Sequence, residues 1–372
     1  MKKDTLYLKY YDTLVAYLTV EDNLPKSLEI VNSNLFFDKF DKVILNEEQT
    51  IKWIKSRIRP NSQAGLNKIL NHYNIKSEDN LWWWKLFLET KGMNVKDKLY
   101  ISTTEYGEDN NPWNLIYIEG NNYKGLTINT TTTALNIVGA CEKNLYRING
   151  NLAIVKKSLY DNTVDCIAEE LAYNICTRLG IKCAPAQYLG NNICYSIIDE
   201  NIDLIHAEDL FKLDEHNVQR VYEALLKKQV PTSTLIDYLR MVLFDILTIQ
   251  LDRNMTNFAF YKNNGIIHMY RLYDNGLSLF SATRINNNFN FIYCGSDATQ
   301  VLDFVKRQLN RLNVNSLFNG SLNKSYLYDI FNKFAKDYET VRGVKVSEIV
   351  DIIYNRYKHI ISSTQYTELN SF

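Results

Sequence analysis

The segment from Leu235 to Leu251 is the longest apolar stretch of the chain, and it constrains the fold more than any other feature. Three charged residues interrupt it, namely Asp237, Arg240 and Asp245. A membrane-spanning helix needs about 18 or more consecutive apolar residues, so this stretch does not qualify. We predict instead a buried core helix over residues 233–250, after which the sequence returns to strand-like character.

The part of the chain before this helix is rich in strand signals. Residues 5–20 are mostly aromatic and β-branched, which predicts a hairpin. Asn149-Gly150, a strong hairpin turn signal, joins two more strand-like segments. Residues 163–179 repeat apolar side chains at helical spacing. Further elements are expected as helices within 47–72 and at 208–229, and as strands at 186–189 and 193–198.

The part after the core helix predicts a small hairpin that turns at residues 263–265, and then mostly amphipathic helix over 299–362. A β-rich part with one helix, followed by a helical part with one hairpin, predicts an α+β fold with the two lobes of a protein kinase. We therefore predict an N-terminal accessory module at 1–125, a small β-rich N-lobe at 126–205 and a helical C-lobe at 206–372. The accessory module either braces the N-lobe or recognises a partner, and bracing is the preferred interpretation.

Composition narrows the class of protein. Lys plus Arg and Asp plus Glu both number 42, so no net charge draws the chain to nucleic acid or to an acidic membrane surface. We expect no direct nucleic-acid partner and no membrane association. The six cysteines contain no CxxC pair, unlike the usual zinc and disulfide frameworks, and we interpret them as reduced thiols of a cytoplasmic protein.

Three oxygen-bearing side chains carry the predicted chemistry. Asp252 follows the core helix, Asn257 stands five residues later, and Asp274 lies seventeen residues beyond that, after the hairpin. Phosphoryl transfer depends on positioned carboxylates and metal ligands in this order and spacing. We predict that Asp252 is the catalytic carboxylate that orients the acceptor hydroxyl, and that Asn257 and Asp274 hold Mg²⁺. The alternative interpretation is that all three are turn residues and helix caps.

A second group of residues is predicted to bind ATP. Lys156 ends an Ala-Ile-Val-Lys run on a predicted strand and is expected to contact the phosphates, whereas Lys157 should point to the opposite face. Glu169, on the following helix, is expected to pair with Lys156. Gly139 and Lys143 form a candidate phosphate-covering turn, although a single glycine is a weak signal.

These residues resemble those of the HipA-like serine/threonine kinases, a family named after the toxin kinase of toxin–antitoxin modules. The resemblance covers residues 45–280. It matches the family's motifs at Asp252, Asn257, Asp274, Lys156 and Glu169, and at the segment Gly139-Ala140-Cys141-Glu142-Lys143. It implies an ATP- and Mg²⁺-dependent kinase that phosphorylates a Ser or Thr of a protein substrate, and an antitoxin-type partner.

The sequence departs from the family's pattern near the predicted catalytic residue. Gln250-Leu251 replaces a His-Arg pair, and Asn254 stands where family members often carry His. The segment expected over the phosphates is also poor in glycine. A catalytically weak or inactive pseudokinase, acting as a nucleotide-binding regulatory module, therefore remains an alternative, and a small-molecule phosphotransferase of the same fold is a third.

Overall fold

The computed structural model combines α-helices with several antiparallel sheets. It describes residues 2–36, 43–58, 66–94, 97–106, 143–158, 163–213, 215–281, 289 and 291–362. The chain divides into unit 1, Met1–Leu159 with Ile197–Ile205, and unit 2, Tyr160–Ser196 with His206–Phe372. The predicted boundary after residue 125 lies outside the described residues, and the three-region division stays a prediction.

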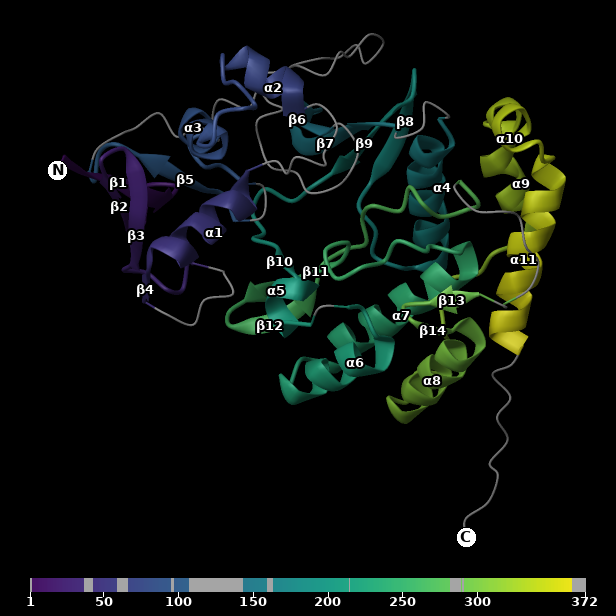
Figure 1. Cartoon of the computed structure of the whole chain (residues 1–372). Coiled ribbons are helices and arrows are strands. Elements are labelled where there is room, and N and C mark those ends of the chain that lie inside the picture. Colours follow the sequence, from purple (N-terminus) through teal and green to yellow (C-terminus); the bar gives the residue numbers. More distant parts are fainter. Residues whose placement is uncertain are drawn as a thin grey trace. The chain divides into compact units, whose positions relative to one another are not determined.

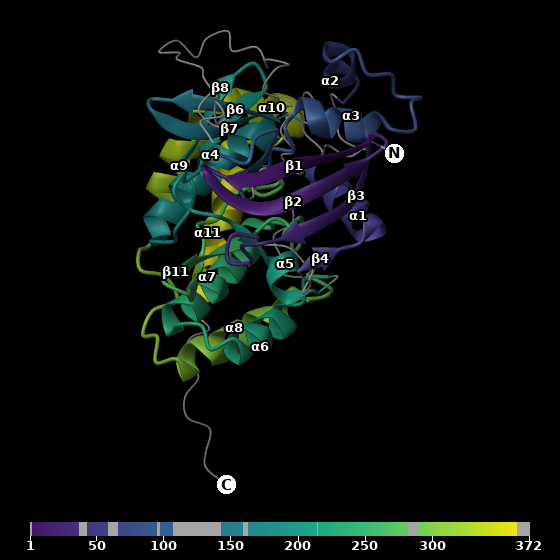
Figure 2. The same ribbon diagram turned by 90° about the vertical axis from the view of Figure 1, so that its left-hand side faces the viewer.

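Unit 1 contains a five-stranded antiparallel sheet with the strand order β4-β3-β2-β1-β5. Its strands are β1 (Lys3–Tyr10), β2 (Thr13–Glu21), β3 (Leu24–Ile30), β4 (Ile44–Leu45) and β5 (Leu99–Ser102). Figure 2 shows β1, β2 and β3 side by side, and the first two form the predicted N-terminal hairpin. β5 joins the sheet by pairing Tyr7 with Ser102, a long-range contact that no local pattern indicates.

Three helices accompany this sheet: α1 (Glu47–Arg57), α2 (Leu66–His72) and α3 (Trp82–Glu89). The side chain of Asn46 caps α1 by accepting from the N–H of Gln49, which satisfies a backbone donor at the helix start. Trp84 stacks on Phe87 with ring centroids 5.6 Å apart, and both belong to the core that the helices share with the strands.

A separate hairpin of unit 1 consists of β6 (Lys143–Ile148) and β7 (Asn151–Lys157) and turns at the predicted residues 149–150. Leu145 and Leu152 of this hairpin pack with Met93 and Tyr100 in a small core. The N-terminal sheet and the hairpin thus share a small core within one unit, and the bracing interpretation stays a prediction.

Unit 2 is built around the core helix α7 (Thr232–Thr248), the helix predicted from the apolar stretch (Figure 1). It contacts α6 (Val218–Lys227), α8 (Ala298–Arg311), α11 (Val346–Ser362) and the strand β12 (Ile266–Met269). Because neighbours cover several sides of α7, most of its apolar residues are buried.

The C-terminal end of α7 is contacted by an arginine side chain from the C-terminal helix α11. Arg356 of α11 is buried and donates to the carbonyls of Ile246 and Leu247 in the last turn of α7. The last carbonyls of a helix lack partners within the helix, and a cation near them is favourable. The C-terminal helices therefore support the helix that precedes Asp252.

The remaining elements of unit 2 include the predicted helix at 163–179 and the predicted strands at 186–189 and 193–198, together with short elements that were not predicted. They are α4 (Val164–Leu179), β8 (Ala186–Gly190), β9 (Ile193–Ile197), β10 (Ile205–His206), α5 (Ala207–Phe211), β11 (Ala259–Asn263), β13 (Ile292–Tyr293), β14 (Ser296–Asp297), α9 (Lys324–Asn332) and α10 (Ala335–Arg342). β9 and β10 each extend across a boundary between the units. α4 ends at Gly180, whose φ of 70° is the left-handed conformation that glycine adopts without strain.

The predicted single helix over 208–229 is wrong. The segment forms two helices, α5 and α6, because Lys212 takes a left-handed backbone with φ 55° and ends the first one. Asn217 then caps α6 by accepting from the N–H of Arg220. The break places His216 between the two helices, where it becomes part of the site described below.

Among the described residues, no helix combines the length and the apolar character needed to cross a bilayer.

Candidate active site

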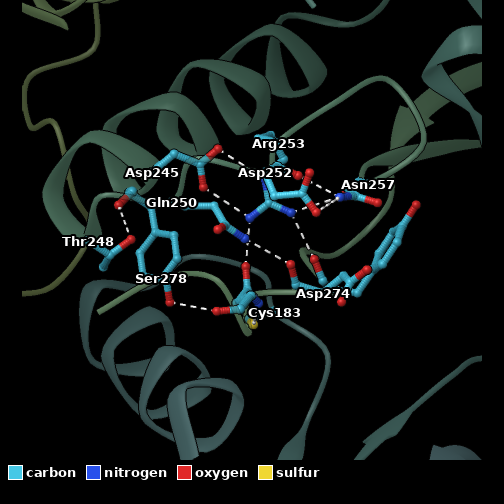
Figure 3. A network of polar contacts seen from close by, with 12 residues as sticks. Cys183, Asp245, Thr248, Gln250, Asp252, Arg253, Asn257, Asp274 and Ser278 are labelled. Atoms are coloured by element: carbon cyan, nitrogen blue, oxygen red, sulfur yellow. Dashed lines mark hydrogen bonds and ion pairs between the residues drawn. The ribbon is translucent and has the colours of Figure 1, made fainter. Parts of the chain in front are cut away.

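The loop that follows α7 brings Asp252 and Asn257 together. Ile249 ends the helix in a left-handed conformation with φ 54°, and the chain turns away from the helix axis. The Nδ2 atom of Asn257 donates to Oδ2 of Asp252 at 3.0 Å (Figure 3). The Nδ2 atom of Asn254 donates to Oδ1 of Asp252 at 3.1 Å. Both carboxylate oxygens of Asp252 are thus oriented by amide donors of its own loop.

The backbone of this loop is held by histidines from the preceding segment. The Nδ1 atom of His216 lies 2.6 Å from the carbonyl oxygen of Arg253. The Nδ1 atom of His206 lies 2.6 Å from the carbonyl oxygen of Thr256. A carbonyl only accepts, so each histidine carries its proton on Nδ1 for this bond. Two points of the loop backbone are therefore fixed from outside.

The hairpin of β11 and β12 leads the chain back to Asp274, as predicted. The carbonyl of Asp274 accepts from Nε2 of Gln250 at 2.9 Å, which joins this segment to the start of the Asp252 loop. The backbone of Asp274 is left-handed, with φ 55°, a conformation in which an aspartate is tolerated.

Helix α4 contacts the two residues that follow Asp274. The N–H of Asn275 donates to Oε2 of Glu169 at 3.0 Å. A Cβ on Gly276 would lie 3.1 Å from the carbonyl oxygen of Asp165 and 3.3 Å from Oε1 of Glu169. Glycine at this position therefore permits the close approach of α4. The buried carboxylate of Glu169 lies against the two residues that follow Asp274.

The electrostatics indicate that Asp252 and Asp274 interact. Partial burial raises the pKa of Asp252, and the negative charge of Asp274 raises it further. The amide donors Asn254 and Asn257 and the positive charge of Arg253 act in the opposite direction. Asp252 itself is exposed to solvent and Asp274 is half-buried, so a substrate could reach the pair.

The donor set fits Mg²⁺ bound with a nucleotide. Magnesium takes oxygen ligands and is commonly bound by one or two carboxylates together with substrate phosphates and water. Asp274 and Asn257 supply a carboxylate and an amide oxygen beside a second carboxylate, and a cation there would offset the repulsion between Asp252 and Asp274. No group of three or more His, Cys, Asp or Glu side chains suited to a metal occurs in the described part of the chain.

The predicted ATP-binding lysines lie on the hairpin of unit 1. Lys156 and Lys143 are direct partners across β7 and β6, and both are buried. Lys143 begins the strand β6, where it pairs with Lys156, and the predicted phosphate-covering turn that precedes it stays a prediction. Gly139 lies outside the described residues. The roles of Lys156 and Lys143 toward phosphate, and the pairing of Lys156 with Glu169, stay predictions.

Five polar residues of this site were not predicted to have a role in it: Gln250, Arg253, Asn275, His206 and His216. The sequence did contain one signal for Arg253, because a charged Asp245 inside an apolar helix requires a buried partner. Asp245 and Arg253 form that ion pair, with N–O distance 3.0 Å and both side chains fully buried. Gln250 donates to the backbone carbonyl of Asp274, and Asn275 contacts Glu169 through its N–H and Arg253 through its side chain; the sequence shows none of these contacts.

The structure is similar to solved structures of other bacterial proteins, including the following two. HipA of Shewanella oneidensis MR-1, from a toxin–antitoxin complex with HipB and operator DNA, matches with a TM-score of 0.56 and 12% identity over 98% of this chain and 100% of that one. The proinflammatory kinase CtkA of Helicobacter pylori matches with a TM-score of 0.41 and 18% identity over 61% of this chain and 91% of that one. No family model matches the sequence, and no curated protein matches it.

The match to HipA extends over both units and nearly the whole of each chain, so it defines the fold class of this protein. The chain has the fold of HipA. The predicted resemblance to the HipA-like kinases is thereby confirmed at the level of the fold.

Proposed function

We propose that the protein is an ATP- and Mg²⁺-dependent kinase that transfers the γ-phosphoryl group to a Ser or Thr hydroxyl of a protein. The observation that carries the proposal is the convergence of Asp252, Asn257 and Asp274 in unit 2, from positions before and after a hairpin. The HipA fold supports it. The proposal includes a bilobal layout.

Each residue of the site has a distinct task in this proposal. Asp252 orients the acceptor hydroxyl and takes up its proton, and a raised pKa makes its carboxylate a better base. Asn257 and Asp274 hold Mg²⁺, which when bound neutralises charge on the phosphates. Lys156 and Lys143, which are paired neighbours on β7 and β6, provide positive charge for the phosphates. Glu169 anchors Lys156.

A partner of the antitoxin type is part of the proposal. The HipA structure that this chain resembles was solved with HipB and operator DNA. We propose that this chain, too, is held by a regulatory protein partner in the cytoplasm. Direct binding of nucleic acid is not proposed, because the balanced composition does not favour it.

Transfer of radiolabel from [γ-³²P]ATP to the protein itself or to a generic Ser/Thr substrate tests the activity. Asp252→Ala should abolish the transfer while the circular dichroism spectrum and melting temperature stay close to wild type. Asp329→Ala, an exposed aspartate of α9 in the same unit, is the matched control and should retain full transfer. Undiminished transfer by Asp252→Ala would overturn the assignment.

A second candidate function is a nucleotide-binding pseudokinase. Asn254 and Asn257 each donate to one carboxylate oxygen of Asp252, and these bonds compete with an acceptor hydroxyl. Thermal stabilisation by ATP and Mg²⁺ without any phosphoryl transfer would favour this function. Autophosphorylation at a rate that Asp252→Ala removes would exclude it.

A further inference from the structure

Arg253 stands beside the catalytic candidate Asp252, but its side chain points into the protein. Its guanidinium is fully buried and makes five hydrogen bonds. The acceptors are Oδ2 and Oδ1 of Asp245 at 3.0 Å each, the carbonyls of Asn257 and Tyr273 at 2.8 Å each, and Oδ1 of Asn275 at 2.6 Å. All five donor positions of the guanidinium can be occupied in this arrangement.

These acceptors surround the two predicted magnesium ligands. Arg253 donates to the carbonyl of Asn257 itself. On the other segment it donates to the two neighbours of Asp274, namely the carbonyl of Tyr273 and the side chain of Asn275. Arg253 therefore spans the only two segments that supply metal ligands in the proposal. The planar fork of an arginine sets the distance between such acceptors, whereas the point charge of a lysine does not.

Asp245 keeps the guanidinium charged and in place. Burial disfavours the charged form, but the negative charge and hydrogen bonds of Asp245 outweigh it and raise the pKa of Arg253 above its usual range. The hydroxyl of Tyr293 donates to Oδ2 of Asp245 at 2.6 Å and fixes the carboxylate from the other side. Arg253 thus has a rigid anchor in the core helix.

We infer that Arg253 is a positioning residue for the metal site, and that its guanidinium sets the separation of Asn257 and Asp274. This inference rests on the proposed function, because it assigns a role toward the Mg²⁺ of that same site. Residues that orient metal ligands without touching the metal typically change metal affinity by roughly 10- to 100-fold when altered. A core ion pair with only a structural role would lower stability and leave metal affinity intact.

The test measures Mn²⁺, a spectroscopic substitute for Mg²⁺, bound to the full chain with a non-hydrolysable ATP analogue. Electron paramagnetic resonance gives the Mn²⁺ dissociation constant, and thermal melting gives stability. Arg253→Lys should weaken Mn²⁺ binding by roughly 10-fold or more. Arg356→Lys is the matched control, because it alters another buried arginine of unit 2, which donates to two α7 carbonyls and lies over the rings of Phe289 and Phe291.

The control should lower the melting temperature to a similar degree and leave the Mn²⁺ dissociation constant within about 3-fold of wild type. If Arg253→Lys and Arg356→Lys bind Mn²⁺ equally well, the inference is overturned. If the wild-type protein binds no Mn²⁺ with the nucleotide, the proposed function fails instead.

A double variant covers the case in which Arg253→Lys does not fold. Asp245→Asn combined with Arg253→Met removes both charges, so no lone charge stays buried, and the asparagine oxygen still accepts from Tyr293. A folded double variant should also bind Mn²⁺ roughly 10-fold more weakly. A folded double variant with wild-type Mn²⁺ affinity would contradict the positioning role.

Discussion

The two segments that supply the predicted metal ligands are held in different ways. The loop with Asp252 and Asn257 is fixed by its own Arg253, which is anchored on Asp245 of α7, and by two histidines from the preceding segment. The segment after Asp274 is also contacted by Arg253 and Glu169, but in addition it is folded tightly on itself, with Leu279 and Phe280 both in left-handed backbone at φ 53° and 64°. Such conformations cost about 1–3 kcal/mol each in a non-glycine residue and persist only where the surroundings enforce them.

The difference shows where each segment is vulnerable. The loop depends on a few polar side chains, so removing one should have a large effect. The segment after Asp274 depends on many close contacts, including the hydroxyl of Ser281 on the carbonyl of Gly276 and the N–H of Leu279 on the carbonyl of Thr248. A single small change there should have a modest effect on stability.

The largest effect is expected for Asp245→Ala, which leaves the charge of Arg253 buried without its carboxylate. Breaking a fully buried ion pair by removing one partner costs roughly 3–5 kcal/mol. Urea denaturation should show this loss in the free energy of unfolding. Asp237→Ala, which removes an exposed ion pair with Lys182, should cost at most about 1 kcal/mol. Equal losses in the two variants would mean that the loop does not depend on Arg253 and its partner.

The second effect concerns pH, through the histidine that holds the loop. Burial lowers the pKa of His216 from 6.5 to about 4, so the fold favours the neutral ring. Between pH 6.5 and 4 the unfolded chain binds the proton and the folded protein does not, so the stability from His216 is present above pH 6.5 and is lost as the pH falls to 4. The loss amounts to about 3 kcal/mol.

The comparison of wild type with His216→Gln isolates this contribution, because the carboxylates titrate equally in both proteins. The stability difference between the two should narrow as the pH falls from 7 to 4. A difference that stays constant over that range would show that His216 does not need to be neutral in the loop.

The smallest effect is expected at Gly276, in the segment after Asp274. Gly276→Ala places a Cβ close to Asp165 and Glu169, and an overpacked methyl costs roughly 1–3 kcal/mol. Gly265→Ala is the matched control, since its φ of 79° is strained for alanine but no atom lies within 4 Å. Both variants should lose stability, but only Gly276→Ala should lower phosphoryl transfer. Loss of transfer in both would argue against the contact between Glu169 and this segment.

Much of this arrangement could be predicted from local patterns. The N-terminal hairpin, the turn at Asn149-Gly150, the helix that ends at Gly180 and the core helix all follow from periodicity and turn residues. Local patterns failed where the backbone leaves its preferred conformation. Lys212, in left-handed backbone, breaks a segment whose apolar spacing predicts one helix.

The sequence by itself determined the order of the elements and the spacing of Asp252, Asn257 and Asp274, because hydrophobic periodicity and turn chemistry are local properties. Only the tertiary structure decided what holds those residues, since Gln250, Arg253, His216 and Glu169 act through contacts between distant segments. Hydrogen bonds to backbone carbonyls and N–H groups leave no trace in side-chain patterns, because every residue offers the same backbone groups.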